Sequence, residues 1–195
     1  ANVSAMMDFA IATFGKLTTM INNAGPVALL AAKDHEFINL EADVWDRTFA
    51  VQLKGTMLCC KHAIPKLLEN GGGAIVNMSS LGGLVAAAGT AAYGMSKAGI
   101  IHLSRITAAE MRSANIRSNE LLPAFVDTSM QRTAMTMFDE ALGDGGAATM
   151  IGRLQGRMAG PAEMAGVVAF LLSDAASMVN GTAQLADGGT AAALW

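Results

Sequence analysis

A tyrosine and a lysine stand four residues apart, as Tyr93 and Lys97, in a stretch with helical periodicity. Side chains at this spacing lie on one face of a helix, so the phenol and the ammonium group are expected to be neighbours. A phenol, with a reference pKa of about 10, is a poor base at neutral pH, but a nearby cation favours the phenolate. The pair therefore predicts proton transfer by Tyr93, although the same spacing also occurs by chance on solvated helix faces.

Short strand-like runs alternate with longer helical runs along the chain, which predicts a parallel sheet covered by helices. The predicted strands are 17–21, 74–78, 116–122 and 182–185, and the predicted helices are 43–69 with a kink at Pro65, 93–112 and 161–172. Ligands of such sheets bind beyond the carboxyl ends of the strands. Small or polar residues follow the first three strands and are candidates for a site, namely Asn23, Ala24 and Gly25, then Ser80, then 123–128.

These clusters occur in the order typical of the short-chain dehydrogenase/reductase family, which the sequence resembles from Asn2 to about Gly189. The resemblance is carried by Asn22-Asn23-Ala24-Gly25, Ser80, the Tyr-x-x-x-Lys pair, Pro123 to Thr128 and Asp187-Gly188-Gly189. It implies a Rossmann-like α/β fold, with a doubly wound parallel sheet in three α/β/α layers, and usually a homotetramer or a homodimer. The apolar tail 191–195 would suit burial against a partner subunit.

The resemblance also implies a role for each matching residue. Tyr93 would be the general acid/base, Ser80 would hydrogen-bond the substrate oxygen, and Lys97 would hold the nicotinamide ribose and shift the tyrosine pKa. Gln52 occupies the position where the family usually has an asparagine of a proton relay. The cofactor would be NAD or NADP, bound by Asn2, Val3, Asn23, Ala24, Gly25, Tyr93, Lys97, Val126 and Thr128.

The sequence departs from the family pattern at several positions. Gln52 extends the amide of the usual asparagine, Ala124 replaces a common glycine, and Ser118 and Glu120 lie in a strand that is usually more apolar. The family's glycine-rich loop and first strand, which bind the cofactor pyrophosphate, are not matched, so we expect the N-terminal strand-helix units of a longer chain to be missing. The residue that distinguishes NAD from NADP would lie there.

The segment 129–160 is expected to lack regular elements, because small residues and a glycine cluster interrupt every pattern. It is interpreted either as a mobile substrate lid or as a poorly ordered surface loop. As a lid, it would offer flexible apolar contacts to a small or medium, largely apolar secondary alcohol or ketone. Those contacts would come from Met130, Met135, Met137, Phe138, Leu142, Met150 and Ile151.

Composition indicates one compact domain, 1–195, with 52% hydrophobic and 15% charged residues. A net charge of −3 without long charge runs gives no signal for nucleic acid or an anionic membrane. Cys59 and Cys60 are expected to pack as small hydrophobes, and the scattered histidines suggest no metal site. No export signal or apolar run of membrane-spanning length is evident, which favours the cytoplasm.

The sequence thus predicts an NAD(P)-dependent short-chain alcohol dehydrogenase or ketoreductase. Two alternatives stay open. Gln52 and Ala124 are compatible with a regulator that binds the cofactor but is catalytically silent, and the unmatched glycine loop is compatible with a structural fragment that has no cofactor affinity.

Overall fold

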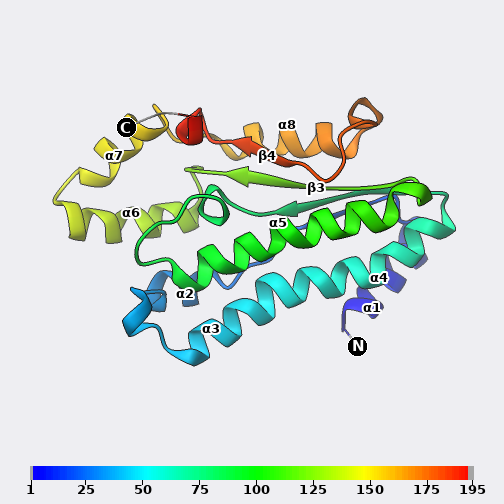
Figure 1. Cartoon of the computed structure of the whole chain (residues 1–195), viewed down its shortest axis with the longest axis horizontal. Coiled ribbons are helices and arrows are strands. Elements are labelled where there is room, and N and C mark those ends of the chain that lie inside the picture. The colour runs from blue at the N-terminus through cyan, green and yellow to red at the C-terminus, as the bar shows by residue number, and fades with distance from the viewer. Residues whose placement is uncertain (1, 193–195) are drawn as a thin grey trace.

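The computed structural model describes residues 2–192, and in this range the strands form one parallel sheet in the order β1-β2-β3-β4 (Figure 1). The strands are β1 (Thr19–Asn22), β2 (Gly73–Met78), β3 (Ile116–Pro123) and β4 (Ala183–Ala186). All of their pairings are parallel. The predicted strands are confirmed, with ends that differ by one or two residues.

Helices cover both faces of the sheet, which confirms the predicted three-layer α/β/α arrangement. On one face lie α4 (Gly55–Glu69) and α5 (Ala91–Met111), with α1 (Asn2–Phe14) against α4. On the other face lies α8 (Pro161–Leu172), the predicted helix 161–172. The predicted helix 93–112 is α5, which begins two residues earlier.

Two apolar cores hold these layers together. Successive side chains of β2 point to opposite faces, so Ile75 enters the core under α4 and α5 and Val76 enters the core under α8. The first core joins Ile75 to Cys60, Leu67 and Ile116, and the second joins Val76 to Leu121 and Leu171. Cys59 and Cys60 are free, and Cys60 is buried as predicted.

The predicted helix 43–69 is present but is interrupted elsewhere than expected. It consists of α3 (Ala42–Phe49), a π-helical segment (Ala50–Lys54) and α4. Helix α4 continues through Pro65, so the break in α-helical geometry falls well before the proline that we expected to kink it. Thr56 Oγ1 donates to the Gln52 carbonyl at 2.6 Å, so this carbonyl of the π-helical segment has a side-chain partner. Single π-helical turns of this kind are frequent at functional sites.

The prediction that the segment 129–160 lacks regular elements was wrong. It contains α6 (Ser129–Leu142) and α7 (Gly146–Leu154). The Thr128 hydroxyl caps α6 by accepting a backbone N–H at 3.2 Å, and the Asp139 carboxylate accepts a backbone N–H of α7 at 2.8 Å. The glycine cluster forms the tight turn between the two helices, with Gly143 at a φ of 86°.

A row of polar side chains crosses the sheet beneath α5. Asn22, Asn77 and Glu120 occupy neighbouring register positions on β1, β2 and β3. Asn22 Nδ2 donates to Asn77 Oδ1 at 2.7 Å, and Asn77 Nδ2 donates to Ser104 Oγ at 2.8 Å. Glu120 is fully buried, and neither carboxyl oxygen has a hydrogen-bond partner among the described residues. Burial raises the pKa of Glu120 to about 7, although the Arg105 charge and the Ser104 hydroxyl act in the opposite direction.

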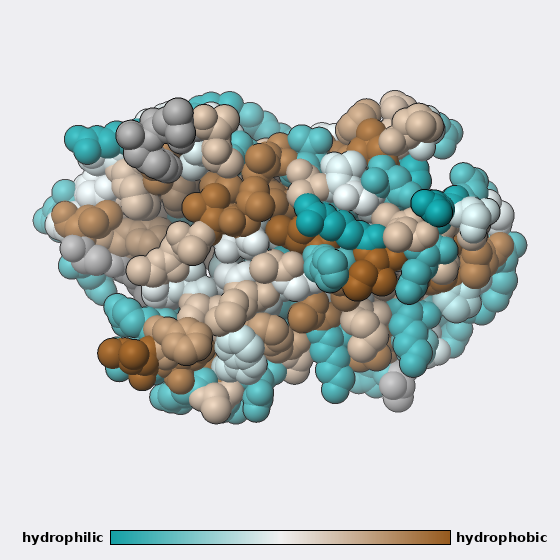
Figure 2. All heavy atoms as spheres, in the orientation of Figure 1, coloured by the Kyte–Doolittle hydropathy of each residue, from teal (hydrophilic) through white to brown (hydrophobic). Residues whose placement is uncertain are grey.

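Several large apolar residues are exposed, among them residues near the β1 edge and in the turn that precedes α3. Ile21 of the edge strand β1 is 47% exposed, and Phe37 and Ile38, in the turn between α2 (Val27–Lys33) and α3, are 72% and 92% exposed. Figure 2 shows an apolar patch at the lower left, over this turn. None of the helices within residues 2–192 has the length and apolarity needed to cross a bilayer.

Candidate active site

The carboxyl ends of the strands lie on the left of Figure 1, where α2, α6, α7 and the start of α5 gather. Asn23–Gly25 follow β1, Ser80 follows β2, and Ala124–Thr128 follow β3. Because all the strand pairs are parallel, these segments leave the sheet at one edge. The predicted gathering of the three clusters is therefore confirmed.

Glycines bring the Ser80 loop into contact with α5. Ser80 begins a 3-10 turn, where its hydroxyl accepts the Gly82 N–H at 3.1 Å. A Cβ at Gly83 would lie 2.8 Å from the Lys97 carbonyl carbon, and a Cβ at Gly94 would lie 3.0 Å from the Gly82 oxygen. Only residues without a Cβ allow so close an approach. The loop can therefore pack directly on the helix that carries Tyr93.

Ser80, Tyr93 and Lys97 form one group at this edge. Tyr93 is half-buried, and its ring and the Ser80 hydroxyl both lie beside Gly82, within 3.4 and 3.6 Å of the position that a Cβ would take there. Lys97 Nζ lies 5.6 Å from the centroid of the Tyr93 ring and donates to the Met78 carbonyl at 2.8 Å. Ser79 Oγ donates to the Lys97 carbonyl at 2.9 Å and ties the end of β2 to α5. The structure thus brings together the three side chains predicted to do the chemistry.

Burial controls the ionisation of this group. It raises the pKa of Tyr93, and the nearby Ser80 hydroxyl offsets only part of the effect. It also lowers the pKa of Lys97 to about 8, because the ammonium loses its hydration. The pKa of Tyr93 is thus raised overall, whereas its spacing to the lysine predicted a lowered pKa. The phenol is therefore protonated at neutral pH, and the ammonium is mostly charged.

The predicted cofactor residues are distributed over several elements. Asn23, Ala24 and Gly25 are exposed at the edge of the sheet, whereas Val126 and Thr128 are half-buried at the start of the α6–α7 segment. Asn2 and Val3 lie in the first turn of α1, which Figure 1 shows toward the right, away from the start of α5. Their assignment to the adenine stays a prediction.

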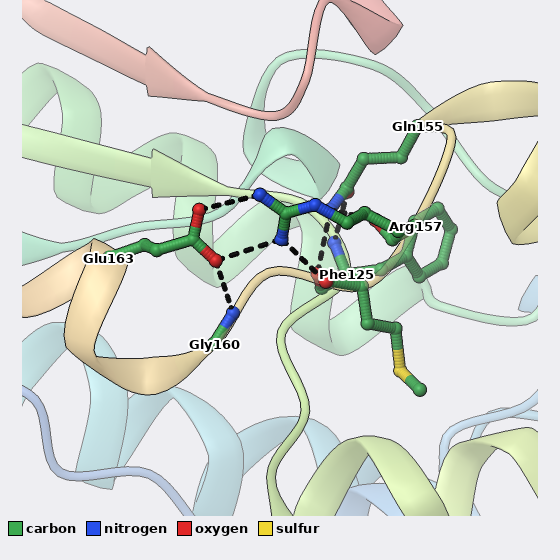
Figure 3. Close-up of polar contacts among 6 residues, drawn as sticks. Phe125, Gln155, Arg157, Gly160 and Glu163 are labelled. Carbon is green, nitrogen blue, oxygen red and sulfur yellow. Dashed lines mark hydrogen bonds and ion pairs between the residues drawn. The ribbon is translucent and has the colours of Figure 1, made fainter.

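The two ends of the segment that contains α6 and α7 are held together by a clamp (Figure 3). The Gln155 side-chain amide donates to the Phe125 carbonyl and accepts the Phe125 N–H, both at 2.8 Å. Next to this contact the chain forms a parallel bridge between Val126 and Ala159. The Asp127 N–H donates to the Ala159 carbonyl at 2.8 Å, and the Ala159 N–H donates to the Phe125 carbonyl at 2.9 Å. The two ends of the segment are therefore held side by side just beyond the end of β3.

An ion pair joins this clamp to the start of α8. Both terminal nitrogens of Arg157 contact the Glu163 carboxylate at 2.8 Å, and Glu163 also accepts the Gly160 N–H at 2.7 Å (Figure 3). The Arg157 guanidinium, with help from the Gly160 N–H, lowers the pKa of Glu163 to about 2. Glu163 is therefore ionised throughout the neutral range.

Known proteins are similar to this chain in sequence and in fold. A family model described as enoyl-(acyl carrier protein) reductase matches residues 1–191. A probable short-chain type dehydrogenase/reductase of Bradyrhizobium diazoefficiens is 37% identical, over 96% of this chain and 64% of its own. Cis-4-hydroxycyclohexanecarboxylate dehydrogenase of Sinomonas cyclohexanicum is 40% identical, over 96% and 71%. The crystal structure of levodione reductase is 31% identical with a TM-score of 0.91, over 98% and 73%. This chain belongs to the short-chain dehydrogenase/reductase family.

The chain spans 64% to 73% of the length of seven curated relatives that it matches. The short-chain dehydrogenase/reductase match thus covers almost all of this chain and about two thirds of each of those proteins.

Gln52, where short-chain dehydrogenases/reductases usually have asparagine, is fixed inside the π-helical segment. It is 2% exposed, and its Oε1 atom lies 2.6 Å from the Ser96 hydroxyl, one turn after Tyr93. A Cβ at Gly25 would lie 3.3 Å from Gln52 Nε2, so the amide reaches between the end of β1 and α5. The longer side chain is thus accommodated by contacts on both sides, and its part in a proton relay stays a prediction.

Asp34 is a residue of this short-chain dehydrogenase/reductase site that sequence reasoning did not find. It is 7% exposed at the end of α2, and its two carboxylate oxygens accept the N–H groups of Ala92 and Tyr93 at 3.0 and 2.9 Å. The contact spans 58 and 59 residues of sequence. Thr90 directly precedes α5 and resembles a local cap, so nothing in the sequence signals that a cap comes from elsewhere.

Proposed function

We propose that the protein is an NAD(P)-dependent oxidoreductase that interconverts a small or medium, largely apolar secondary alcohol and its ketone. The observation that carries this proposal is the grouping of Ser80, Tyr93 and Lys97 at the carboxyl edge of the sheet, with Ser80 and the Tyr93 ring both beside Gly82 and Lys97 against the same ring. A hydroxyl and a phenol that lie together beside a cation suit proton transfer to a carbonyl oxygen.

In the reducing direction, the neutral Tyr93 phenol donates its proton to the carbonyl oxygen of the substrate. Ser80 donates a hydrogen bond to the same oxygen and orients the carbonyl carbon. Lys97 places positive charge beside the phenolate that is left, and so lowers the cost of losing the proton. A bound nicotinamide cofactor supplies the hydride that the carbonyl carbon accepts. In the oxidising direction, the tyrosinate takes the proton back from the alcohol.

The residues at this edge fit the nicotinamide-ribose end of such a cofactor. The Lys97 ammonium has three N–H donors, and one of them is used on the Met78 carbonyl. Among the described contacts the other two are available for ribose hydroxyls. Asn23, Ala24 and Gly25 are exposed on the β1 side of the edge, so a flat ring can approach their backbone. NAD and NADP fit equally, because these residues meet the end of the cofactor that the two share.

The substrate class is supported by the α6–α7 segment and by the relatives. Met130 and Leu142 are 40% and 56% exposed, so α6 offers flexible apolar surface at this edge, whereas the buried Ile151 packs the segment itself. Of the other apolar residues proposed for the lid, the Met137 side chain lies outside the described residues. One relative is named for a ring alcohol, cis-4-hydroxycyclohexanecarboxylate, and one structural neighbour is a levodione reductase. We propose cyclic secondary alcohols and ketones as the first compounds to test.

The test compares the protein with its Tyr93→Phe variant. Nicotinamide absorbance is followed with NAD or NADP and a panel of cyclic and open-chain alcohols and ketones, and cofactor affinity is measured by fluorescence titration. We expect turnover to fall by about a thousandfold or more in the variant, with cofactor binding retained, because the phenol that transfers the proton is removed.

Two other results would contradict the proposal. Cofactor binding without turnover in the unchanged protein would identify a catalytically silent binder. Absence of cofactor binding would identify a structural fragment that has no cofactor affinity. Association into homo-oligomers stays a prediction, since residues 193–195 of the apolar tail lie outside the described residues.

A further inference from the structure

We infer that Asp34 is a positioning residue for the proton-transfer step, acting through the first turn of α5 on Tyr93. The inference rests on the proposed function of Tyr93. It extends that proposal to a residue outside the Ser80, Tyr93 and Lys97 group, and it assigns the α2 segment a part in catalysis.

The first turn of α5 has no cap of its own. The N–H groups at the start of a helix have no partner within the helix and are usually satisfied by the side chain that precedes it. Thr90 occupies that position, but its hydroxyl donates to the Ala87 carbonyl at 2.8 Å and makes no cap hydrogen bond. The Asp34 carboxylate takes the place of the local cap, since its two oxygens accept the second and third N–H groups of the helix.

The second of those N–H groups belongs to the catalytic tyrosine itself. Asp34 Oδ2 lies 2.9 Å from the Tyr93 nitrogen, so the carboxylate fixes the backbone from which the phenol projects. Asp34 is in turn held by the end of α2, where its own N–H donates to the Leu30 carbonyl at 3.1 Å. A carboxylate that accepts two N–H groups at a helix start is also favoured by the helix dipole. Tyr93 is thus anchored from outside its own helix.

This anchor connects the catalytic tyrosine to the proposed substrate side of the molecule. Helix α2 contacts both α3 and α6, and α6 belongs to the segment proposed to cover the substrate. The Asp34 carboxylate therefore links α2, which packs on α6, to the start of α5 through hydrogen bonds. A displacement of about 1 Å at a reacting group can reduce turnover a hundredfold, so release of this link should affect kcat.

The test uses Asp34→Ala and Asp34→Asn in the full protein. We expect kcat to fall in Asp34→Ala on the order of tenfold to a hundredfold, with the KM for the cofactor changed less than about twofold. Asp34→Asn keeps one acceptor oxygen and should recover part of kcat. Val168→Ala removes partly buried apolar volume from α8, which packs on the core formed with Val76, and serves as a control that lowers stability from the opposite face of the sheet to α5.

A second measurement does not depend on turnover. Tyr93 is the single tyrosine of the sequence, so tyrosinate absorbance against pH reports its ionisation alone. Loss of the carboxylate removes a negative charge and admits water at the helix start, and both changes should lower the raised pKa of Tyr93 toward that of free tyrosine. Val168→Ala should titrate like the unchanged protein.

The outcomes separate the two proposals. Loss of kcat together with a lower Tyr93 pKa in Asp34→Ala, and partial recovery in Asp34→Asn, would support the positioning role. If Asp34→Ala loses only stability, as Val168→Ala does, and keeps kcat and the Tyr93 titration, the role is merely structural and the inference fails. If the unchanged protein has no turnover, the proposed function fails, and the Tyr93 titration still decides the inference.

Discussion

The buried carboxyl of Glu120 should make the stability of this protein fall as the pH rises through neutrality. Its pKa is raised from the ordinary value of 4.5 to about 7, because the folded chain buries it without a hydrogen-bond partner among the described residues. Between these two values the folded state holds a proton that the unfolded state has released. The contribution of Glu120 to stability is therefore fully present below about pH 4.5 and is lost as the pH rises to about 7.

The size of the effect follows from the difference between the two pKa values. Each pKa unit corresponds to about 1.4 kcal/mol, so the change from 4.5 to about 7 corresponds to about 3 kcal/mol of unfolding free energy. Glu120→Gln keeps the shape of the neutral acid but cannot ionise. Its stability should be within about 1 kcal/mol of that of the unchanged protein at about pH 5 and should exceed it by up to about 3 kcal/mol at about pH 8.

Urea unfolding followed by far-ultraviolet circular dichroism, at several pH values between about 5 and 8, measures this difference. Glu69→Gln is the matched control, because Glu69 is exposed and forms only a surface ion pair with Lys66 at 3.2 Å. It should change stability by less than about 1 kcal/mol at every pH. If the difference between Glu120→Gln and the unchanged protein is the same at both ends of the range, Glu120 does not titrate there and the reasoning is wrong.

Further predictions concern the proposed active site at the carboxyl edge of the sheet. Gly83→Ala should lower kcat about tenfold or more, because its Cβ would lie 2.8 Å from the α5 backbone. The control Gly166→Ala should leave kcat unchanged, since the space around Gly166 is open. Equal kcat values in the two variants would show that the contact of the Ser80 loop with α5 does not matter for catalysis. Gln155→Ala should raise the substrate KM several-fold in steady-state assays by freeing the clamp, and an unchanged KM would show that the adjacent backbone bridge suffices. Because burial raises the pKa of Tyr93, ketone reduction should proceed at neutral pH, whereas the rate of alcohol oxidation should rise with pH above neutrality. A flat oxidation profile up to about pH 10 would contradict that assignment.

Local chemistry was sufficient to predict the strands and the central chemical pair. The strand at 73–78 is apolar and bounded by glycines and serines, and β3 ends at Pro123, so its limits follow from the residues alone. The Tyr93 and Lys97 spacing predicted their common face, because it depends only on helical geometry.

Contacts between distant residues explain what the sequence did not reveal. The cap of α7 comes from Asp139, eight residues before the N–H that it accepts, and the anchor of α5 comes from Asp34. The π-helical segment depends on the packing of Gln52 between two elements. The sequence marked Glu120 as unusual in its strand, but its ionisation depends on burial that only the assembled sheet provides.

The clamp formed by Gln155 and Phe125 also bears on how this segment can vary. Because the clamp and the adjacent bridge join residues 125–127 to residues 155–159, they hold the ends of the α6–α7 segment together whatever the length between them. For a flexible connection, each doubling of length adds only about 0.6 kcal/mol of closure entropy. The segment can therefore be exchanged, shortened or lengthened as a cassette in engineering, provided that the residues of the clamp are kept.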